Sequence, residues 1–555
     1  MAGTTSRVEI VTGPQGPVIY ADGRPLTGPD PAASIRRRLP VPTEIAPQTL
    51  VILCSPLHGD AVDEWLARVP ETCAVLAVEL DDDLGRVTRP WHPPASSRRF
   101  VYATGTSAAV TAGEHLIRTT GLRRVSTVYL TGGARLHRDG YLRLEEQLVD
   151  SAMRFWQNRG TEIRLLRRWM SNVVRNATLA GLPVDALRGR IPRRAVLVGA
   201  GPSLEDHLGE LRRLFPAYGR RHRADVSLVA LDTALPTLAA AGVTPDMVVA
   251  MDGQLANAAD LLPWRWENTA FLLDATVHFS VPRRVPADRR FWFVSRFSEN
   301  ALFRDPELAE LLAGFPVLPP RGSVAPAALH LLTERLGVRA VFCVGIDFWY
   351  RPPKTHARMS PGDRAVRRST SRLTHRDGHD RVLARPWRAV TLRDGSVRPG
   401  DAVLADQARL LRQSVERLPG SFFHAAGAEG LTIGSDAFPG DAPVTRWLEL
   451  ESSAPVTGDA PPAPGPDPDD DTAAARRLTA LRALVLRLTD QESRLADPAA
   501  AAYLDAGLDC AVMDLPQWPL MTLRRDWIEL HRPRILRAVR DLRRRAERAL
   551  HCAAE

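Results

Sequence analysis

Three aspartates follow short apolar runs in the middle of the sequence, at positions Asp232, Asp252 and Asp347. Such runs are typical of buried parallel strands, and α/β proteins bind ligands beyond the carboxyl ends of those strands. A carboxylate in that place can accept a proton from a hydroxyl group or bind Mg²⁺. We predict that Asp252 and Asp347 take part in catalysis and that Asp232 and Thr233 contact the ligand. A helix cap or a loop hydrogen bond would also explain Asp252.

A glycine-rich turn, Gly199-Ala200-Gly201-Pro202-Ser203, lies between an apolar run and a helical pattern. Glycines allow a phosphate to approach the backbone closely, and the first N–H groups of the helix can bind it. We predict that Gly199, Gly201, Pro202 and Ser203 bind the phosphate of a nucleotide. A Gly-x-Gly sequence after a strand is equally compatible with a simple tight turn.

Lys354, Thr355 and His356 form a polar cluster, and Lys354 is the only lysine among the 73 basic residues of the chain. An imidazole can act as a general base, and a cation can balance the charge of a departing phosphate. We predict these roles for His356 and Lys354, and a ligand contact for Thr355.

The segment 351–385 around this cluster is rich in Arg and Pro, which predicts a lid or an acceptor-side loop. His375 and His379 lie in it four residues apart. They lack the H-E-x-x-H pattern of a zinc enzyme, so a solvated loop is favoured over a metal site.

Two further groups of polar residues belong to predicted helices. Gly322 and Ser323 open a helix that extends to Leu336, and a small-residue N-terminus suits a phosphate or a carboxylate, so we predict ligand contacts for both. Asn172 and Asn176 lie one turn apart on a helical pattern. They either reach the site or face solvent.

The pattern of strands and helices that must position these residues predicts an α/β protein. Its N-terminal domain is expected to be Rossmann-like and its central domain doubly wound. Leu50–Cys54 and Ala74–Val78 are predicted strands, and Glu79 after the second could hold a ribose hydroxyl group. The loop after Cys54 lacks G-x-G-x-x-G, which favours a scaffold without a cofactor. The predicted domains are an N-terminal hairpin plus Rossmann-like domain (1–140), a helical connector (141–190), a central domain (191–450), a Pro/Asp-rich linker (451–475) and a helical C-terminal domain (476–555).

Composition narrows the class of protein. A length of 555 residues predicts two or three domains, and a net charge of +9 suits an anionic ligand. The basic residues are scattered, which argues against nucleic acid as the partner. Five dispersed cysteines, no signal pattern and no run of about 18 apolar residues predict a cytoplasmic protein without a membrane span.

Six ordered blocks carry a resemblance to a known family. The sequence is similar to the motility accessory factor family of bacterial flagellar glycosyltransferases, whose central domain is shared with archaeal 6-hydroxymethyl-7,8-dihydropterin pyrophosphokinases. The resemblance covers roughly residues 15 to 440 and implies a sialyltransferase-like central fold. One departure is Leu431, which replaces the second glycine of a Glu-Gly-Gly run. The blocks are Val-Gly-Ala-Gly-Pro-Ser-Leu (198–204), Asp-Thr-Ala-Leu (232–235), Thr-Pro-Asp-Met-Val-Val-Ala-Met-Asp (244–252), Gly-Ser-Val-Ala (322–325), Gly-Ile-Asp (345–347) and Lys-Thr-His-Ala (354–357).

The resemblance implies two chemistries. In the first, a nonulosonic sugar passes from a CMP-activated donor to a Ser or Thr hydroxyl group of flagellin or a similar protein, with no metal required. In the second, ATP donates pyrophosphate to a pterin alcohol, and the three aspartates hold Mg²⁺. A non-catalytic scaffold is a third interpretation. We expect the first, because the large N- and C-terminal additions suit an enzyme whose acceptor is a protein.

Overall fold

The computed structural model describes most of the chain. The described residues are 8–57, 59, 61–88, 99–217, 225–261, 268–296, 303, 305–319, 322–373, 387–392, 395–418, 421–424, 436–437, 442–451, 470–496 and 525–554. The chain divides into two compact units, one formed by residues 1–164 with 513–524 and the other by 165–512 with 525–555. Their division falls inside one long helix, α5 (Arg138–Asn176).

The first unit contains a parallel sheet of four strands in the order β6-β5-β4-β7. Every residue of β4 and β5 is buried, as the two apolar runs predict. Helix α4 and the first turns of α5 pack against this sheet through Leu116, Leu144 and Leu148. The elements are β1 (Val8–Gly13), β2 (Gly16–Ala21), β3 (Arg24–Pro25), α1 (Pro31–Arg36), β4 (Thr49–Cys54), α2 (Val62–Leu66), β5 (Ala74–Glu79), α3 (Asp82–Thr88), β6 (Phe100–Thr104), α4 (Thr106–Thr120) and β7 (Arg124–Tyr129).

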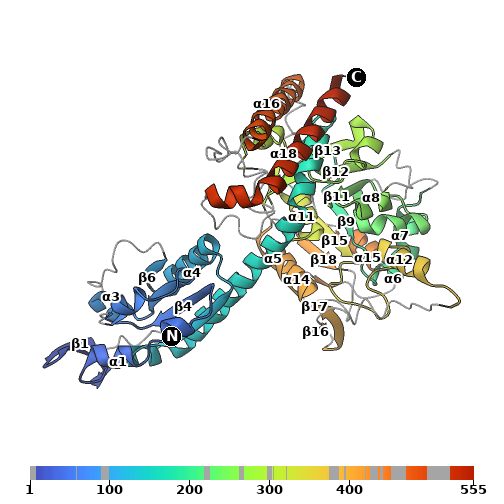
Figure 1. Cartoon of the computed structure of the whole chain (residues 1–555). Helices are drawn as coiled ribbons and strands as arrows, with labels where there is room; N and C mark the ends of the chain where they lie inside the picture. The colour runs from blue at the N-terminus through green and yellow to red at the C-terminus, as the bar shows by residue number, and fades with distance from the viewer. Residues whose placement is uncertain are drawn as a thin grey trace. The chain divides into compact units, whose positions relative to one another are not determined.

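The second unit is built on a parallel sheet of ten strands among the described residues (Figure 1). Its strands are β8 (Leu182–Pro183), β9 (Arg194–Val198), β10 (Val226–Leu231), β11 (Met247–Ala250), β12 (Ala270–Asp274), β13 (Arg290–Ser295), β14 (Val317–Leu318), β15 (Ala340–Val344), β18 (Ser421–His424) and β19 (Asp436–Ala437). Its helices are α6 (Leu204–Leu214), α7 (Leu235–Ala240), α8 (Leu255–Leu261), α10 (Pro306–Leu311), α11 (Val324–His330), α12 (Pro361–Ser369), α14 (Ala402–Arg417), α15 (Pro443–Glu451), α16 (Asp470–Ala496) and α18 (Arg525–Ala554). A separate hairpin joins β16 (Trp387–Thr391) to β17 (Val397–Asp401).

Helices cover both faces of this sheet. On one face, Trp447 of α15 packs against Phe342 of β15 and Phe423 of β18, with ring centroids 5.2 and 5.7 Å apart. On the other face, Leu411 and Val415 of α14 join the core that contains Val341. Neighbouring residues of a strand point to opposite faces, so Val341 and Phe342 of β15 pack toward helices on opposite sides of the sheet. A parallel sheet with helices on both faces is doubly wound. The predicted fold class is therefore confirmed.

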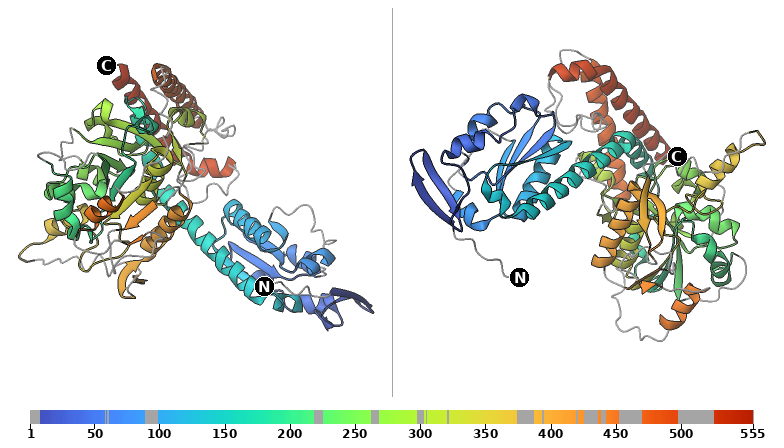
Figure 2. Two further views of the ribbon diagram at one scale, coloured as in Figure 1. Left: turned by 180° about the vertical axis from the view of Figure 1, so that it is seen from behind. Right: turned by 90° about the horizontal axis from the view of Figure 1, so that it is seen from below.

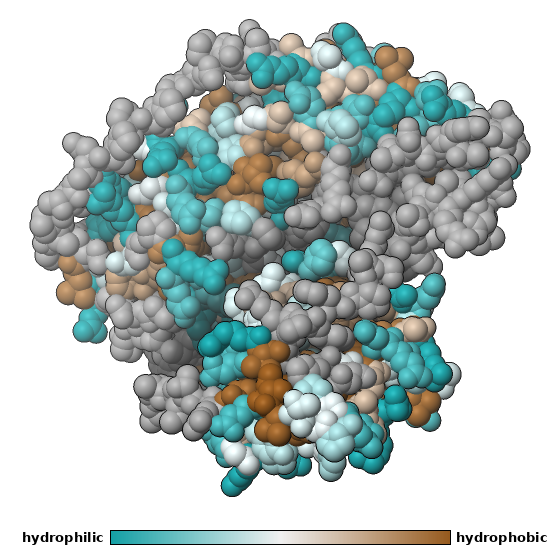
Figure 3. Space-filling model, turned by 90° about the vertical axis from the view of Figure 1, so that its left-hand side faces the viewer, coloured by the Kyte–Doolittle hydropathy of each residue, from teal (hydrophilic) through white to brown (hydrophobic). Residues whose placement is uncertain are grey.

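The C-terminal helices belong to the second unit. Helix α16 packs along α18, and the side chain of Arg487 on α16 lies 2.6 Å from Asp305, next to α10. Apolar side chains at helical spacing on α18 are buried, namely Ile535, Val539 and Ala546. Hydrophilic residues cover much of the described surface in Figure 3. Within the described residues, none of the helices has the length and apolar character needed to cross a membrane.

Candidate functional site at the carboxyl edge of the large sheet

Strand order places the candidate site between β9 and β15. From β9 the chain builds β10, β11, β12, β13 and β14 outward on one side, then returns to β15 on the other side. Figure 1 labels most of these strands, and Figure 2 shows the same ribbon from two further sides. The direction of winding reverses at this pair, and α/β sheets bind ligands beyond the carboxyl ends of the two strands at such a point. Gly199 follows β9 there, and Gly345 follows β15.

The glycine turn after β9 is in close contact with the turn after β15. The N–H of Gly199 donates to the carbonyl of Val344 at 2.8 Å, and the N–H of Gly201 donates to the carbonyl of Gly345 at 2.7 Å. A β-carbon on Gly201 would lie 2.4 Å from Oδ2 of Asp347. Glycine is therefore required at position 201 by the approach of another part of this chain.

Asp347 holds the glycine turn from the opposite strand. Its Oδ2 accepts a hydrogen bond of 2.8 Å from the backbone N–H of Ser203, and its Oδ1 accepts one from the Ser203 hydroxyl group. Both residues are buried, and burial raises the pKa of Asp347, opposed by these hydrogen bonds. Asp347 thus reaches the predicted position at the strand end, where both of its oxygens already bind Ser203.

The start of α6 differs from the expectation of free N–H groups. The N–H of Ser203 is bonded to Asp347, that of Leu204 to the carbonyl of Gly201 at 3.1 Å, and that of Asp206 to the carbonyl of Ser203 at 3.1 Å. Glu205 and Asp206 add negative charge to this first turn. A phosphate at this turn would have to compete with three carboxylates for the positive end of the helix. The first N–H groups of α6 are thus largely occupied, and the binding of a phosphate by the Gly199–Ser203 turn remains a prediction.

The Lys-Thr-His segment is attached to the same helix. Nζ of Lys354 lies 2.7 Å from Oε2 of Glu205, and their side chains are 27% and 18% exposed. Arg351 forms two hydrogen bonds with Asp206, at 3.2 and 2.9 Å. The N–H of Ala357 donates to the carbonyl of Ala200 at 2.9 Å, which ties the segment directly to the glycine turn.

The pairing of Lys354 affects its predicted role. Its charge is already balanced by Glu205, so a departing phosphate would have to replace that carboxylate. His356, in contrast, is exposed, and its Nδ1 lies 3.1 Å from the hydroxyl oxygen of Thr355. Its imidazole is therefore accessible to a substrate, and the Thr355 hydroxyl group can orient it.

Asp252 follows β11 and shapes the loop that leads into α8. Its Oδ1 accepts from the N–H of Gln254 at 2.9 Å, and its Oδ2 accepts from Nδ2 of Asn257 at 2.7 Å. These contacts match the alternative of a loop hydrogen bond that the sequence left open. Its predicted catalytic role remains a prediction.

Asp232 and Thr233 follow β10 and form a short 3₁₀ turn before α7. Asp232 is buried, and its Oδ1 accepts from the N–H of Thr233 at 2.8 Å. These two residues stand at the carboxyl edge, as predicted for ligand contacts. The contacts themselves remain a prediction.

Gly322 and Ser323 lie at the start of α11, which follows the edge strand β14. A β-carbon on Gly322 would meet Leu410 of α14 at 2.3 Å, and the positive φ of +73° at this glycine also favours its residue type. The hydroxyl oxygen of Ser323 is buried and has no hydrogen-bond partner among the described residues.

Two asparagines of α5 connect the helix to the loops beyond β11 and β12. Nδ2 of Asn172 donates to the carbonyls of Gly253 at 3.1 Å and Thr276 at 2.9 Å. Nδ2 of Asn176 donates to the carbonyls of Ala275 at 3.0 Å and Val277 at 2.9 Å. Both side chains are buried, so the alternative that they face solvent is wrong.

Asp274 and His207 also lie at this edge, although the sequence interpretation did not select them. Asp274 accepts from the N–H of Thr276 and of Ser295, each at 2.8 Å, and burial raises its pKa. Its signal was the apolar run Phe271–Leu273 directly before it.

His207 lies one helical turn after Ser203, and burial lowers its pKa, opposed by nearby carboxylates. No sequence pattern distinguished it from an ordinary surface histidine.

The carboxylates do not form a metal site. Both oxygens of Asp347 accept from Ser203 in the turn after β9, and those of Asp252 accept from Gln254 and Asn257 in its own segment. Asp232 binds the neighbouring Thr233. Among the described residues, no three His, Cys, Asp or Glu side chains are grouped so that they could hold a metal ion. The residues present therefore do not fit the Mg²⁺ of the pyrophosphokinase alternative. His375 and His379 lie outside the described residues, as does the segment 425–435 with Leu431.

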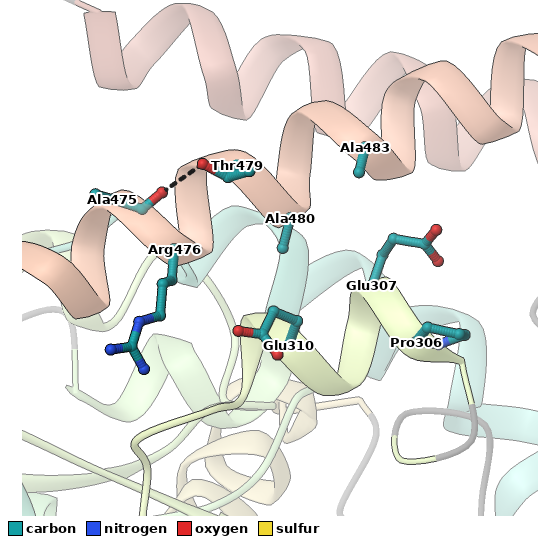
Figure 4. Close-up of a pocket in the computed structure, with 8 residues that line it drawn as sticks. All are labelled: Pro306, Glu307, Glu310, Ala475, Arg476, Thr479, Ala480 and Ala483. Atoms are coloured by element: carbon teal, nitrogen blue, oxygen red, sulfur yellow. Dashed lines mark hydrogen bonds between the residues drawn. The ribbon is translucent and has the colours of Figure 1, made fainter.

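Two cavities lie near these elements. One, of about 560 Å³, separates Glu307 and Glu310 of α10 from Arg476 and Ala480 of α16 and contains none of the predicted site residues (Figure 4). The other, of about 220 Å³, is lined by Phe348, by β16 and by α14. Phe348 directly follows Asp347, so the smaller cavity is adjacent to the candidate site.

Comparisons with known proteins bear on the same elements. Residues 167–352 match the family model described as 6-hydroxymethylpterin diphosphokinase MptE-like. An uncharacterized protein of Treponema pallidum (strain Nichols) is 25% identical over 340 residues, which are 59% of this chain. The match spans 57% of that relative's length. The solved structure of the MAf glycosyltransferase from Magnetospirillum magneticum AMB-1 matches with a TM-score of 0.51 and 12% identity, covering 100% of this chain and 92% of that one.

Proposed function

We propose that the protein is a glycosyltransferase. Part of the chain matches the MptE-like family model, and the fold is similar to that of a motility accessory factor glycosyltransferase. The observation that carries this proposal is the extent of the structural match. It covers 100% of the chain, whereas the family model covers only residues 167–352. The parts shared beyond the central domain favour a protein glycosyltransferase over a small pterin kinase.

The proposed donor is a nonulosonic sugar linked to CMP, and the proposed acceptor is a Ser or Thr hydroxyl group of flagellin or a similar protein. The acceptor oxygen bonds to the anomeric carbon, while the bond from that carbon to the phosphate oxygen breaks. CMP leaves with the electron pair, and the acceptor proton passes to a base. We assign the base to His356, which is exposed next to the carboxyl edge.

Thr355 supports this assignment. If the imidazole donates from Nδ1 to the Thr355 hydroxyl oxygen at 3.1 Å, Nε2 carries the lone pair that a general base requires. Asp347 and Lys354 then act through other groups. Asp347 holds the glycine turn through Ser203, and Lys354 holds the 351–358 segment on Glu205.

The pyrophosphokinase alternative keeps one argument, the name of the matching family model. Against it, Asp232 and Asp252 bind groups of their own loops, whereas Asp347 binds Ser203 of the turn after β9. Among the described residues, the three carboxylates do not group into a metal site. Pyrophosphoryl transfer requires a divalent ion between phosphates and carboxylates, whereas a single phosphate can be bound by cations and N–H groups.

A pair of titrations separates the two functions. In calorimetry, the glycosyltransferase should bind CMP in the presence of EDTA. Intact-mass spectrometry of purified flagellin incubated with the protein and a CMP-activated nonulosonic acid should show the added mass of one sugar. Tight binding of Mg²⁺-ATP with no response to CMP, and no mass change, would contradict the proposal.

A further inference from the structure

An arginine cluster lies beside the candidate site, at the carboxyl end of β12. It consists of Arg168 and Arg175 of α5, Arg283 of the loop after β12, and Arg545 and Arg548 of α18. All five residues belong to the second unit. Helix α18 meets α5 here, because Nη1 of Arg545 donates to the hydroxyl oxygen of Ser171 at 2.8 Å.

The ring of Phe279 lies against two of these five arginines. The guanidinium carbon of Arg175 lies 4.0 Å from the centroid of this ring, and that of Arg283 lies 5.5 Å away. A guanidinium group that stacks on an aromatic ring keeps its N–H edge available for hydrogen bonds. The ring therefore holds two arginine forks in place before any ligand binds.

Within the described ranges, the cluster has no compensating negative charge. Throughout the described part of the chain, no Asp or Glu lies within ion-pair distance of Arg168, Arg175, Arg283, Arg545 or Arg548, although many other arginines are paired. Burial lowers the pKa of Arg175, and Arg545, Arg548 and Arg283 lower it further. Placing like charges together without a counter-charge is unfavourable, and an anion would relieve the repulsion.

His278 connects the cluster to the candidate site. Its backbone N–H donates to the carbonyl of Asp252 at 3.3 Å. Its imidazole is nearly buried, with Nδ1 2.7 Å from the hydroxyl oxygen of Ser280, and burial lowers its pKa, as do Arg175 and Arg168. Both effects favour the neutral imidazole, which adds a polar group without adding charge.

We propose that the arginine cluster and Phe279 form a binding site for a phosphate-bearing small molecule. Guanidinium forks match the oxygens of a phosphate group, and the site stands at the edge of the sheet where α/β proteins bind ligands. The cluster has five arginines, two of them stacked on one aromatic ring, whereas a protein that binds nucleic acid can contact six to ten phosphates. This inference goes beyond the proposed function, because it holds for any reaction with a phosphorylated substrate.

Calorimetry with inorganic pyrophosphate and with CMP, on the full-length protein at low salt, tests the proposal. The Arg175→Gln/Arg545→Gln variant should bind at least one of these probes about 10-fold to 100-fold more weakly than the unchanged protein. The Arg175→Lys variant keeps the charge and loses the forked guanidinium group. Its affinity should lie between those of the double variant and the unchanged protein. Arg537→Gln, which removes one positive charge at an exposed position of the same helix α18, is the control and should leave both affinities unchanged.

Fluorescence anisotropy with a 20-base-pair DNA duplex is the second arm. Equal affinities of the double variant and the unchanged protein for both probes, or no binding of either probe by the unchanged protein, would overturn the proposal. So would DNA binding that is lost in the double variant while pyrophosphate and CMP are unaffected. The sugar-transfer assay is scored separately, so a failure of the proposed glycosyltransferase activity is distinguishable from a failure of this site.

Discussion

Ser203 and Asp347, 144 residues apart in sequence, are joined by two hydrogen bonds that connect the turn after β9 to the turn after β15. The two strands are neighbours in the sheet, and the reversal of winding lies between them. Asp347, for which the sequence predicts a catalytic role, fixes the shape of the glycine turn through these two bonds. The catalytic role itself remains a prediction.

Gly201→Ala should destabilise the second unit by about 1–3 kcal/mol, because the added carbon would lie 2.4 Å from Oδ2 of Asp347. Gly209→Ala in the following helix is the matched control, since nothing lies within 4 Å of its added carbon. That control should gain about 0.5–1 kcal/mol from helix propensity. Urea unfolding measures both changes, and equal stability of the two variants would contradict the close contact.

Ser203→Ala should lower both stability and sugar transfer. The substitution leaves Oδ1 of the buried Asp347 without its hydroxyl donor, at a cost of about 1–3 kcal/mol. Asp347→Asn should show a similar loss, since an amide presents one oxygen and one donor to the same two groups. Unfolding in urea and initial transfer rates measure the effects. Full activity in both variants would remove this pair from the site.

A double-mutant cycle separates two roles for Lys354. If it anchors its segment on Glu205, Lys354→Met and Glu205→Gln should each reduce activity, and the double variant should resemble either single one. If Lys354 instead stabilises the departing phosphate, the Lys354→Met substitution should lower kcat strongly whether residue 205 is Glu or Gln. Initial rates of transfer for the four proteins decide between these roles, and additive effects would contradict the anchoring role.

Asn172→Ala should disturb the loops beyond β11 and β12, because the carbonyls of Gly253 and Thr276 both lose their donor. We expect a cost of about 1–3 kcal/mol and a lower kcat. Asn158→Ala, an exposed position on the same helix, is the control and should be nearly neutral. Hydrogen exchange of residues 252–278 should accelerate in the first variant alone.

Glu79 should make the first unit less stable as pH rises. Burial raises its pKa from 4.5 to about 7, opposed by hydrogen bonds from Ser55 and Tyr141. The folded state holds the proton more tightly than the unfolded state. The resulting stability is therefore complete below pH 4.5 and lost as the pH reaches about 7, a change of about 3 kcal/mol.

Protection factors of the amides in β4 and β5, corrected for intrinsic exchange, measure this effect between pH 4.5 and 8. The Glu79→Gln variant should abolish the decline, whereas Glu44→Gln at an exposed position should retain it. A pH-independent protection in the unchanged protein would show that the Glu79 carboxyl group is not coupled to folding.

Much of the architecture follows from the sequence alone. Uninterrupted apolar runs such as Val226–Leu231 can only be buried on both faces, which requires a parallel sheet with helices on each side. The aspartates and the glycine turn could be assigned to the carboxyl edge for the same reason, because each directly follows a strand.

The partners of these side chains were decided only by the tertiary structure. Asp252 and Asp347 have the same local pattern, yet one binds Gln254 and Asn257 nearby and the other binds Ser203 from a distant turn. The arginine cluster is likewise assembled from α5, the loop after β12 and α18. Local patterns determine which side of a sheet a residue occupies, whereas long-range packing determines what it touches, because charges and hydrogen bonds act across space and not along the chain.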